Sequence, residues 1–205
     1  MKYTELATKE STQKTVEALA KRNVEAIVVE NGAEALEKIK ELIPKGASVM
    51  NGASVTLEQL GLVDYLKSGQ HGWNNLHEGI VAEKDPAKQA QLRKLAVLSD
   101  YYLGSVHALA ETGEFIIASN TGSQLSHVVF TSQNLIFVAS TKKIVPTLLD
   151  AMDRLRVHVM PLEEVHMQEK YGFSTAANKI LTFAGENGMM GRKIRIILVN
   201  EDLGF

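Results

Sequence analysis

Apolar and polar positions along the chain repeat with two different periods, one typical of a helix and one of a strand. Around Val16 and Leu19 the apolar residues recur at helical spacing, as in a helix with one buried face. Residues 24–29 form a β-branched run of strand length. The first part of the chain therefore predicts a helix around Val16, a strand over 24–29, a helix carrying Leu36, Ile39, Leu42 and Ile43, and a short strand over 47–50.

The second half contains longer apolar runs separated by polar loops. Asp85 and Pro86 predict the start of a helix, because aspartate caps a first turn and proline fits the first helical position. We expect Leu92, Leu95 and Leu98 to form the buried face of this helix. Further strands are predicted over 115–118, 135–139 and 194–199, and a further helix after Pro146. The last strand is mainly apolar, which indicates burial on both faces.

The alternation of strands and helices predicts βαβ units, in which helices connect parallel strands. We therefore expect an α/β fold with a mostly parallel sheet flanked by helices. The chain shows no internal repeat and no low-complexity linker. Residues 1–205 are expected to form a single domain, with 1–46 as its N-terminal helix–strand–helix portion.

Composition narrows the classes of function. The 205 residues are 45% hydrophobic and 22% charged, with a net charge of −2, so no nucleic-acid partner is expected. The chain has no cysteine, which excludes disulfides, thiolate catalysis and an iron–sulfur cluster bound by this chain. No apolar run approaches the roughly 20 residues that span a bilayer, so we expect no membrane association and a cytoplasmic location.

No metal site and no cofactor are predicted. His71 and His77 are six positions apart, which does not place both rings on one helical face, as a zinc-binding His-Glu-x-x-His helix requires. No Gly-x-Gly-x-x-Gly sequence follows the first predicted strand, so a dinucleotide site is not indicated.

Small polar residues follow several predicted strands. In an open parallel sheet, ligands bind beyond the carboxyl ends of the strands, where loops meet helix N-termini. Hydroxyl, amide and backbone N–H groups there would bind a small anionic metabolite. The alternative is that these residues only form turns. A strand-to-helix turn is enough to explain the polar residues of the loop after 47–50. The candidate ligand-binding residues are Asn51, Gly52, Ser54, Gly104, Thr112, Gly113, Asn120, Gly122, Ser123, Gln124 and Lys142.

Glu111 is the sharpest catalytic candidate. It lies between apolar residues, with Leu109 before it and Phe115 after it. A carboxylate placed in this way can be partly desolvated, which raises its pKa and suits acid–base or nucleophilic work. The alternative is an exposed glutamate in a turn ahead of Thr112 and Gly113.

The central segment resembles the signature of a known family. Residues 99–113 read SDYYLGSVHALAETG, and the segments 120–124 (NTGSQ) and 142–148 (KKIVPTL) follow in order and spacing. Together with the closing residues 194–204, these segments resemble the lactate-utilisation (LUD) domain family. The resemblance is good from Ser99 to the C-terminus and looser from Ala47.

The resemblance implies a Rossmann-like sheet of the type found in sugar-phosphate isomerases and CoA transferases. It also implies a role in bacterial oxidation of lactate to pyruvate, in which a partner subunit carries iron–sulfur clusters. Without cysteine, this chain would be the cluster-free component. Some relatives have an Asn-Arg pair where this chain has Ser123-Gln124, so Lys142 or Lys143 would supply the positive charge.

Two functions stay open. In the first, the chain is an accessory or small-ligand-binding component of lactate oxidation. In the second, it is an enzyme of the sugar-phosphate isomerase or CoA-transferase type. In this second function, Glu111 is the acid, base or nucleophile. It would then have to be buried beside Asp100 or Asn120. The oligomeric state is also open, and a homo-oligomer is one alternative.

Overall fold

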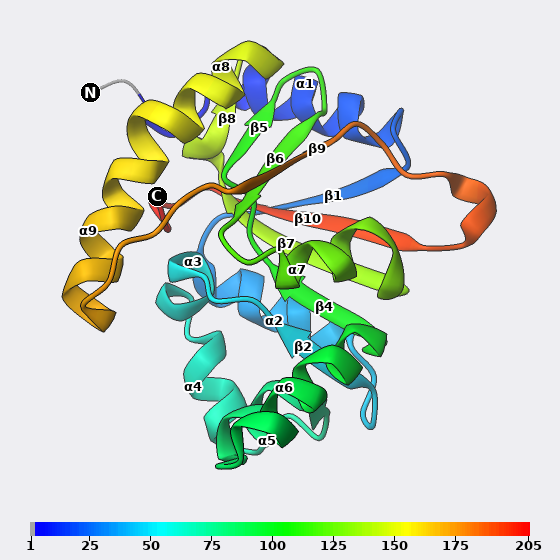
Figure 1. The fold of residues 1–205 in the computed structure, drawn as a ribbon. Coiled ribbons are helices and arrows are strands. Elements are labelled where there is room, and N and C mark those ends of the chain that lie inside the picture. The colour runs from blue at the N-terminus through cyan, green and yellow to red at the C-terminus, as the bar shows by residue number, and fades with distance from the viewer. Residues whose placement is uncertain (1–2) are drawn as a thin grey trace.

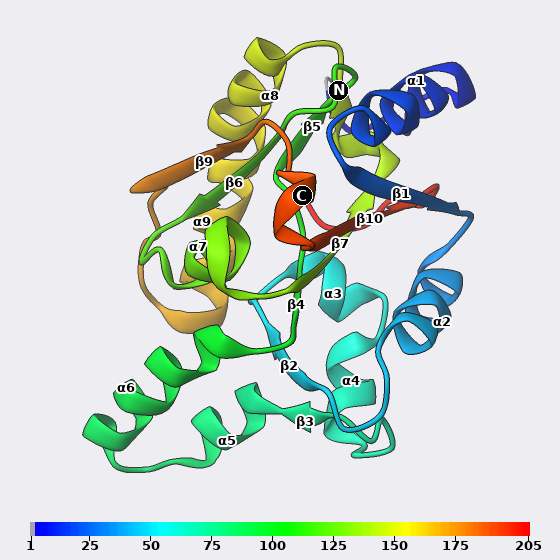
Figure 2. The same cartoon turned by 90° about the vertical axis from the view of Figure 1, so that its right-hand side faces the viewer.

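The computed structural model describes residues 3–205 and arranges them around two sheets packed face to face (Figure 1, Figure 2). Residues 1–2 of the predicted domain lie outside the described residues. All strand pairs of the first sheet are parallel, which confirms the predicted α/β, Rossmann-like class. The strands of this sheet, in spatial order, are β1 (Val24–Val29), β10 (Lys193–Val199), β7 (Asn134–Ser140), β4 (Tyr101–Gly104), β2 (Ser48–Asn51) and β3 (Asn74–Asn75).

The second sheet is mixed and packs on one face of the first. Its strands, in spatial order, are β8 (Ile144–Val145), β5 (Ala108–Ala110), β6 (Phe115–Ser119) and β9 (Lys179–Phe183). β6 pairs antiparallel with both β5 and β9, whereas β5 and β8 are parallel. The strand predicted over 115–118 is therefore not part of the parallel sheet. It forms a hairpin with β5, closed by a turn at Gly113, whose φ is +93°.

Alternate residues of the central strands are buried on opposite faces of the first sheet. In β10, Ile196 and Leu198 pack between the two sheets, whereas Ile197 and Val199 pack on the opposite face. The apolar sequence of this strand thus reflects burial on both faces, as predicted.

Helices cover the remaining faces of the two sheets. Ile39 and Leu57 pack against the first sheet, and Ala151 packs against the second, which gives the layer order helix, sheet, sheet, helix. No helix among the described residues is both long and apolar enough to cross a membrane. The helices are α1 (Lys9–Ala20), α2 (Gly32–Leu42), α3 (Val55–Gln59), α4 (Leu62–Lys67), α5 (Leu76–Ala82), α6 (Pro86–Leu95), α7 (Ser123–Ser126), α8 (Leu148–Arg154) and α9 (Met160–Tyr171).

Shorter helical turns connect these elements. The 3₁₀ turns are η1 (Ala96–Leu98), η3 (Thr141–Lys143) and η5 (Gly188–Met190), and the π-helical turns are η2 (His127–Thr131) and η4 (Leu155–Val159). η4 connects α8 to α9 without a loop, so the two helices run on as one long segment (Figure 1).

Helix α6 begins where the sequence predicts, but the prediction of its buried face is wrong. The Asp85 side chain accepts hydrogen bonds from the backbone N–H groups of the first turn, next to Pro86. Leu92, Leu95 and Leu98, however, are 36%, 55% and 71% exposed. α6 packs on α5 at the end of the molecule opposite α1 (Figure 1, Figure 2). Among the described residues no further layer covers these leucines, so the helical periodicity does not correspond to burial here.

Candidate functional site

A cavity of about 430 Å³ lies beyond the carboxyl ends of β2 and β4, a volume in the range of small-molecule sites. Its wall brings together segments that are far apart in the sequence. These are residues 52–56 after β2, residues 104–107 after β4, residues 118–121 and 123–124 around the end of β6, Lys143, parts of η4 and α9, Phe173 and residues 175–177, and the last two residues of the chain. The position agrees with the rule that open parallel sheets bind ligands at this edge.

Six of the predicted ligand-binding residues lie on the cavity wall. They are Gly52, Ser54, Gly104, Asn120, Ser123 and Gln124. Asn51 and Gly122 adjoin wall residues in the sequence but are not part of the wall themselves. Lys142, Thr112 and Gly113 also lie outside it, as do Glu111 and Asp100. The structure therefore brings together the strand-end residues and leaves the carboxylate candidates elsewhere.

Glu111 lies in the turn between β5 and β6, where it contacts helix α1. Its two carboxylate oxygens accept hydrogen bonds from Lys14 Nζ over 2.6 Å and from Ser11 Oγ over 2.7 Å. These bonds hold the pKa of Glu111 below its ordinary value, which is opposite to the expected rise. Glu111 is thus an ionised group that fastens α1 to the hairpin.

Asp100 lies at the amino end of β4, at the opposite edge of the sheet from the cavity. Its carboxylate accepts hydrogen bonds from Ser48 Oγ over 2.6 Å and from the Ser48 backbone N–H over 2.9 Å. The Asp100 N–H donates in return to Ser48 Oγ. These bonds lower the pKa of Asp100 and join the starts of β2 and β4.

The two adjacent lysines of η3 point in different directions. Lys142 forms an ion pair with Asp202 and donates to the Gly204 carbonyl over 2.7 Å, which ties the C-terminal segment to the sheet. Lys143 belongs to the cavity wall, and only 4% of it is exposed. Of the two lysines that the sequence offered as the source of positive charge, Lys143 is the one at the cavity.

The ammonium group of Lys143 is held by neutral oxygens. Its Nζ donates to Thr56 Oγ1 over 3.0 Å, to Ser105 Oγ over 3.1 Å and to the Val106 carbonyl over 3.2 Å. No carboxylate forms an ion pair with it among residues 3–205. Burial, with the positive charges of Arg154 and Lys142 nearby, moves the pKa of Lys143 well below its ordinary value.

Arg154 adds a second buried cation to this region. It is fully buried, and its Nη1 donates to the carbonyl of His107. Its Nε and Nη2 have no hydrogen-bond partner within the described part of the chain. Two buried cations without a carboxylate create a positive potential on this side of the cavity.

His107 completes the inner wall as a neutral ring. Its Nδ1 accepts a hydrogen bond from the Ala118 N–H over 3.1 Å, which places the ring hydrogen on Nε2. Burial and the charges of Lys143 and Arg154 lower the pKa of His107 to about 3. At neutral pH this ring therefore carries no charge and can offer one N–H donor.

Gly52 is required by a close approach in the wall. A Cβ atom at this position would lie 2.4 Å from the Tyr102 hydroxyl. That hydroxyl donates to Gln124 Oε1 over 3.3 Å, and Gln124 Nε2 donates to the Ala118 carbonyl over 2.7 Å. The glycine thus lets Tyr102 and Gln124 fix the strand-end loops to one another.

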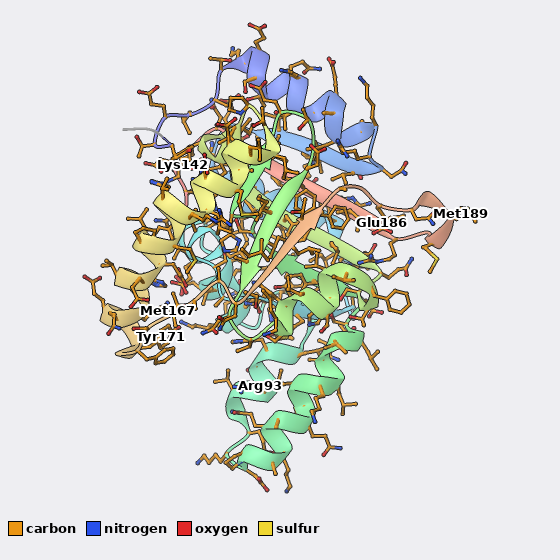
Figure 3. The ribbon with its side chains drawn as sticks, turned by 45° about the horizontal axis from the view of Figure 1, so that its top comes forward. Arg93, Lys142, Met167, Tyr171, Glu186 and Met189 are labelled. Atoms are coloured by element: carbon orange, nitrogen blue, oxygen red, sulfur yellow. The ribbon has the colours of Figure 1, made fainter. Side chains whose placement is uncertain are left out.

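Sequence reasoning missed the side of the cavity that α9 and the C-terminus provide. The missed residues on this side include Met160, Glu163, Met167, Phe173 and Phe205. Met167 and Tyr171 both come from α9, near the end of the segment that leads to Phe173 (Figure 3). These positions follow no predicted strand, so the strand-end rule could not find them.

Among residues 3–205 no group of three or more histidine, aspartate and glutamate side chains could hold a metal ion. His71 is buried, and its Nδ1 accepts a hydrogen bond from the Trp73 N–H. His127 is also buried; its ring stacks on Tyr102 at 4.6 Å between centroids and bonds Ser132.

A family model of the LUD domain matches residues 12–198. The chain belongs to the LUD-domain family. This LUD domain is also similar to the crystal structure, at 1.70 Å resolution, of a DUF162 family protein from Deinococcus radiodurans. The TM-score is 0.60 at 14% sequence identity, over 96% of this chain and 100% of the other, so the likeness concerns the fold. No curated protein matches the LUD domain described here.

Proposed function

We propose that the cavity binds a small anionic metabolite with a carboxylate or phosphate group. On this proposal, the chain is the ligand-binding component of a lactate-oxidising system. The observation that supports it is Lys143, a buried cation on the cavity wall without a carboxylate partner among the described residues.

The energetics of burial favour an anionic ligand. A buried cation without a counter-charge costs several kcal/mol, and an anion bound nearby would offset that cost. Arg154 strengthens the same potential from a second buried position. Hydroxyl and amide groups of Ser54, Asn120 and Ser123 add polar partners along the wall.

Glu163 suggests how such a ligand is oriented. This carboxylate also lies on the wall, but its side chain is about one-third exposed, whereas Lys143 is almost fully buried. The anionic group of the ligand would therefore lie at the inner, Lys143 end, and an uncharged or hydroxylated group would face Glu163.

The role in lactate oxidation rests on the family, which is associated with lactate utilisation. Electron transfer in such a system needs a redox centre. Because this chain has no cysteine to bind an iron–sulfur cluster, we propose that a partner subunit supplies it.

Thermal unfolding with a panel of anions tests this proposal. Lactate, pyruvate, inorganic phosphate, a sugar phosphate and CoA are each added to the wild type, to Lys143→Met and to Lys67→Met. The last variant removes an exposed lysine of α4 away from the cavity. We expect at least one anion to stabilise the wild type and Lys67→Met, and to lose its effect on Lys143→Met. An unchanged effect on Lys143→Met, or no effect of any anion on the wild type, would refute the proposal.

A further inference from the structure

We propose that the amine of Lys143 is a nucleophile that forms an imine with the carbonyl carbon of a small anionic carbonyl compound. This inference rests on the proposed function, because it assigns a reaction to the same cavity. It adds an activity and narrows the ligand to anions that carry an aldehyde or ketone.

The contacts of Lys143 suit an amine as well as an ammonium group. Two of its three partners are the hydroxyls of Thr56 and Ser105, at 3.0 Å and 3.1 Å from Nζ. A hydroxyl accepts from an ammonium group, and after rotation it can donate to the lone pair of a neutral amine. A carboxylate in their place would hold the nitrogen in its charged, unreactive form.

The electrostatic surroundings also raise the unprotonated fraction of Lys143, which is the nucleophile, whereas the protonated fraction is the cation that binds an anion. Burial, Arg154 and Lys142 all lower the pKa of Lys143, and no acidic group within residues 3–205 pairs with it. A lysine desolvated near another cation is a recurring arrangement of amine nucleophiles, because only the unprotonated form has a free electron pair. The same positive charges attract the anionic part of the substrate.

Lys142 provides an internal comparison. It precedes Lys143 directly, but its Nζ pairs with Asp202 and with the Gly204 carbonyl, outside the cavity wall. These contacts point its nitrogen away from the cavity, so a ligand in the cavity does not reach it. The two neighbouring lysines thus differ in their contacts. Lys142 pairs with a carboxylate, whereas Lys143 contacts only neutral oxygens.

The reaction is a condensation without net oxidation or reduction. The lone pair of Nζ attacks the carbonyl carbon, and the carbonyl oxygen takes up a proton to give a carbinolamine. The carbinolamine then loses its oxygen as water, and the C=N bond forms. Ser105 and Thr56, which contact the nitrogen, are placed to pass protons between the nitrogen and the departing oxygen.

Reductive trapping with pyruvate tests this inference directly. The full chain is incubated with pyruvate and cyanoborohydride at neutral pH, digested, and mapped by mass spectrometry. The reduced adduct adds one pyruvic acid less one oxygen atom to the modified lysine. Lactate, which carries an alcohol in place of the carbonyl, is the matched control and should give no adduct. Because the site is mapped on the wild type, the result does not depend on a variant that folds.

We expect adduct occupancy at Lys143 to be at least about tenfold higher than at Lys142, because Lys143 lies on the cavity wall and the nitrogen of Lys142 is occupied by Asp202 and the Gly204 carbonyl. Lys143→Arg keeps the charge but should abolish the main adduct, and Lys67→Met should leave it unchanged. Equal occupancy at Lys142 and Lys143 would overturn the inference.

Thermal shifts separate this inference from the proposed function. Stabilisation by lactate or phosphate without an adduct at Lys143 would leave the anion site standing and refute the imine. Neither stabilisation nor adduct would refute both.

Discussion

Lys143 Nζ lies 3.0 Å from Thr56 Oγ1, and this hydrogen bond joins the turn η3 to helix α3, across 87 positions of the sequence. Thr56 lies in the first turn of α3, after β2, and Lys143 ends the turn that follows β7. The bond holds the lysine nitrogen at the cavity, where no carboxylate of the described residues forms an ion pair with it. The reactivity and affinity that we propose for the cavity both depend on this arrangement.

Gly204 controls the Lys143–Thr56 contact. A Cβ atom at Gly204 would lie 2.1 Å from Thr56 Oγ1 and 3.1 Å from Lys143 Nζ. Gly204→Ala should therefore displace the threonine and weaken anion binding. Gly69→Ala is the matched control, because Gly69 has φ +66° against +67° for Gly204 and no atom within 4 Å of its Cβ.

Both glycine variants carry the same left-handed strain, about 1–2 kcal/mol. We expect chemical denaturation to show a further loss of about 1–2 kcal/mol for Gly204→Ala alone, from the clash and the lost hydrogen bond. Equal losses for the two variants would show that the close approach is unimportant.

Glu111→Gln should leave ligand binding unchanged. The substitution removes an ion pair between Glu111 and Lys14, whose side chain is 62% exposed, so the unfolding free energy should fall by about 1 kcal/mol or less. The pKa of Glu111 is lowered in the folded chain, so this contribution is present at neutral pH and is lost on acidification. Thermal shifts with the panel of anions check this, and loss of the ligand response would restore Glu111 as a catalytic candidate.

Glu163→Gln should increase the affinity for anions. Removing a negative charge from the cavity wall is expected to tighten binding by about 1 kcal/mol, or roughly fivefold. Glu169→Gln, on the same helix but outside the wall, is the control and should have little effect. Calorimetric titration measures both, and weaker binding to Glu163→Gln would mean that this carboxylate accepts hydrogen bonds from the ligand.

His127 should make the fold sensitive to acid. Burial lowers its pKa from 6.5 to about 4, so below pH 6.5 the unfolded chain binds a proton that the folded chain does not. Its contribution to stability therefore falls as the pH drops from 6.5 to about 4, by up to ~1.4 kcal/mol per pH unit.

In His127→Phe, the aromatic ring against Tyr102 is kept and the titrating group is lost. This variant should have a flatter dependence of unfolding free energy on pH across that window, measured by denaturation at several pH values. Parallel curves for variant and wild type would contradict the role of His127.

The sequence predicted four of the six strands of the parallel sheet, β1, β2, β7 and β10, and did not predict β3 and β4. Burial on both faces leaves a strong local pattern in the longest of these strands. β7 and β10 are mainly apolar, and the structure buries alternate residues of each on opposite faces. β9 left no such pattern, because most of its residues are exposed and it is held by pairing with β6. Such long-range pairing has no local signature.

The candidate site was predicted only where it follows the strand-end rule. Gly52 and Ser54, which follow the strand predicted over 47–50, lie on the wall for that reason. Asn120 also follows a predicted strand, but that strand, β6, belongs to the mixed sheet. The choice between Lys142 and Lys143 could not be made from the sequence. It depends on which side chain meets Asp202 and which meets Thr56, contacts that exist only in the folded chain.

Isothermal titration calorimetry of the most stabilising anion, with the wild type and with Lys143→Met, shows whether Lys143 anchors the ligand. If Lys143 anchors the ligand, Lys143→Met should bind at least about tenfold more weakly, equivalent to ~1.4 kcal/mol, while Lys67→Met keeps the wild-type affinity. Equal affinities of the wild type and Lys143→Met would show that Lys143 does not anchor the ligand.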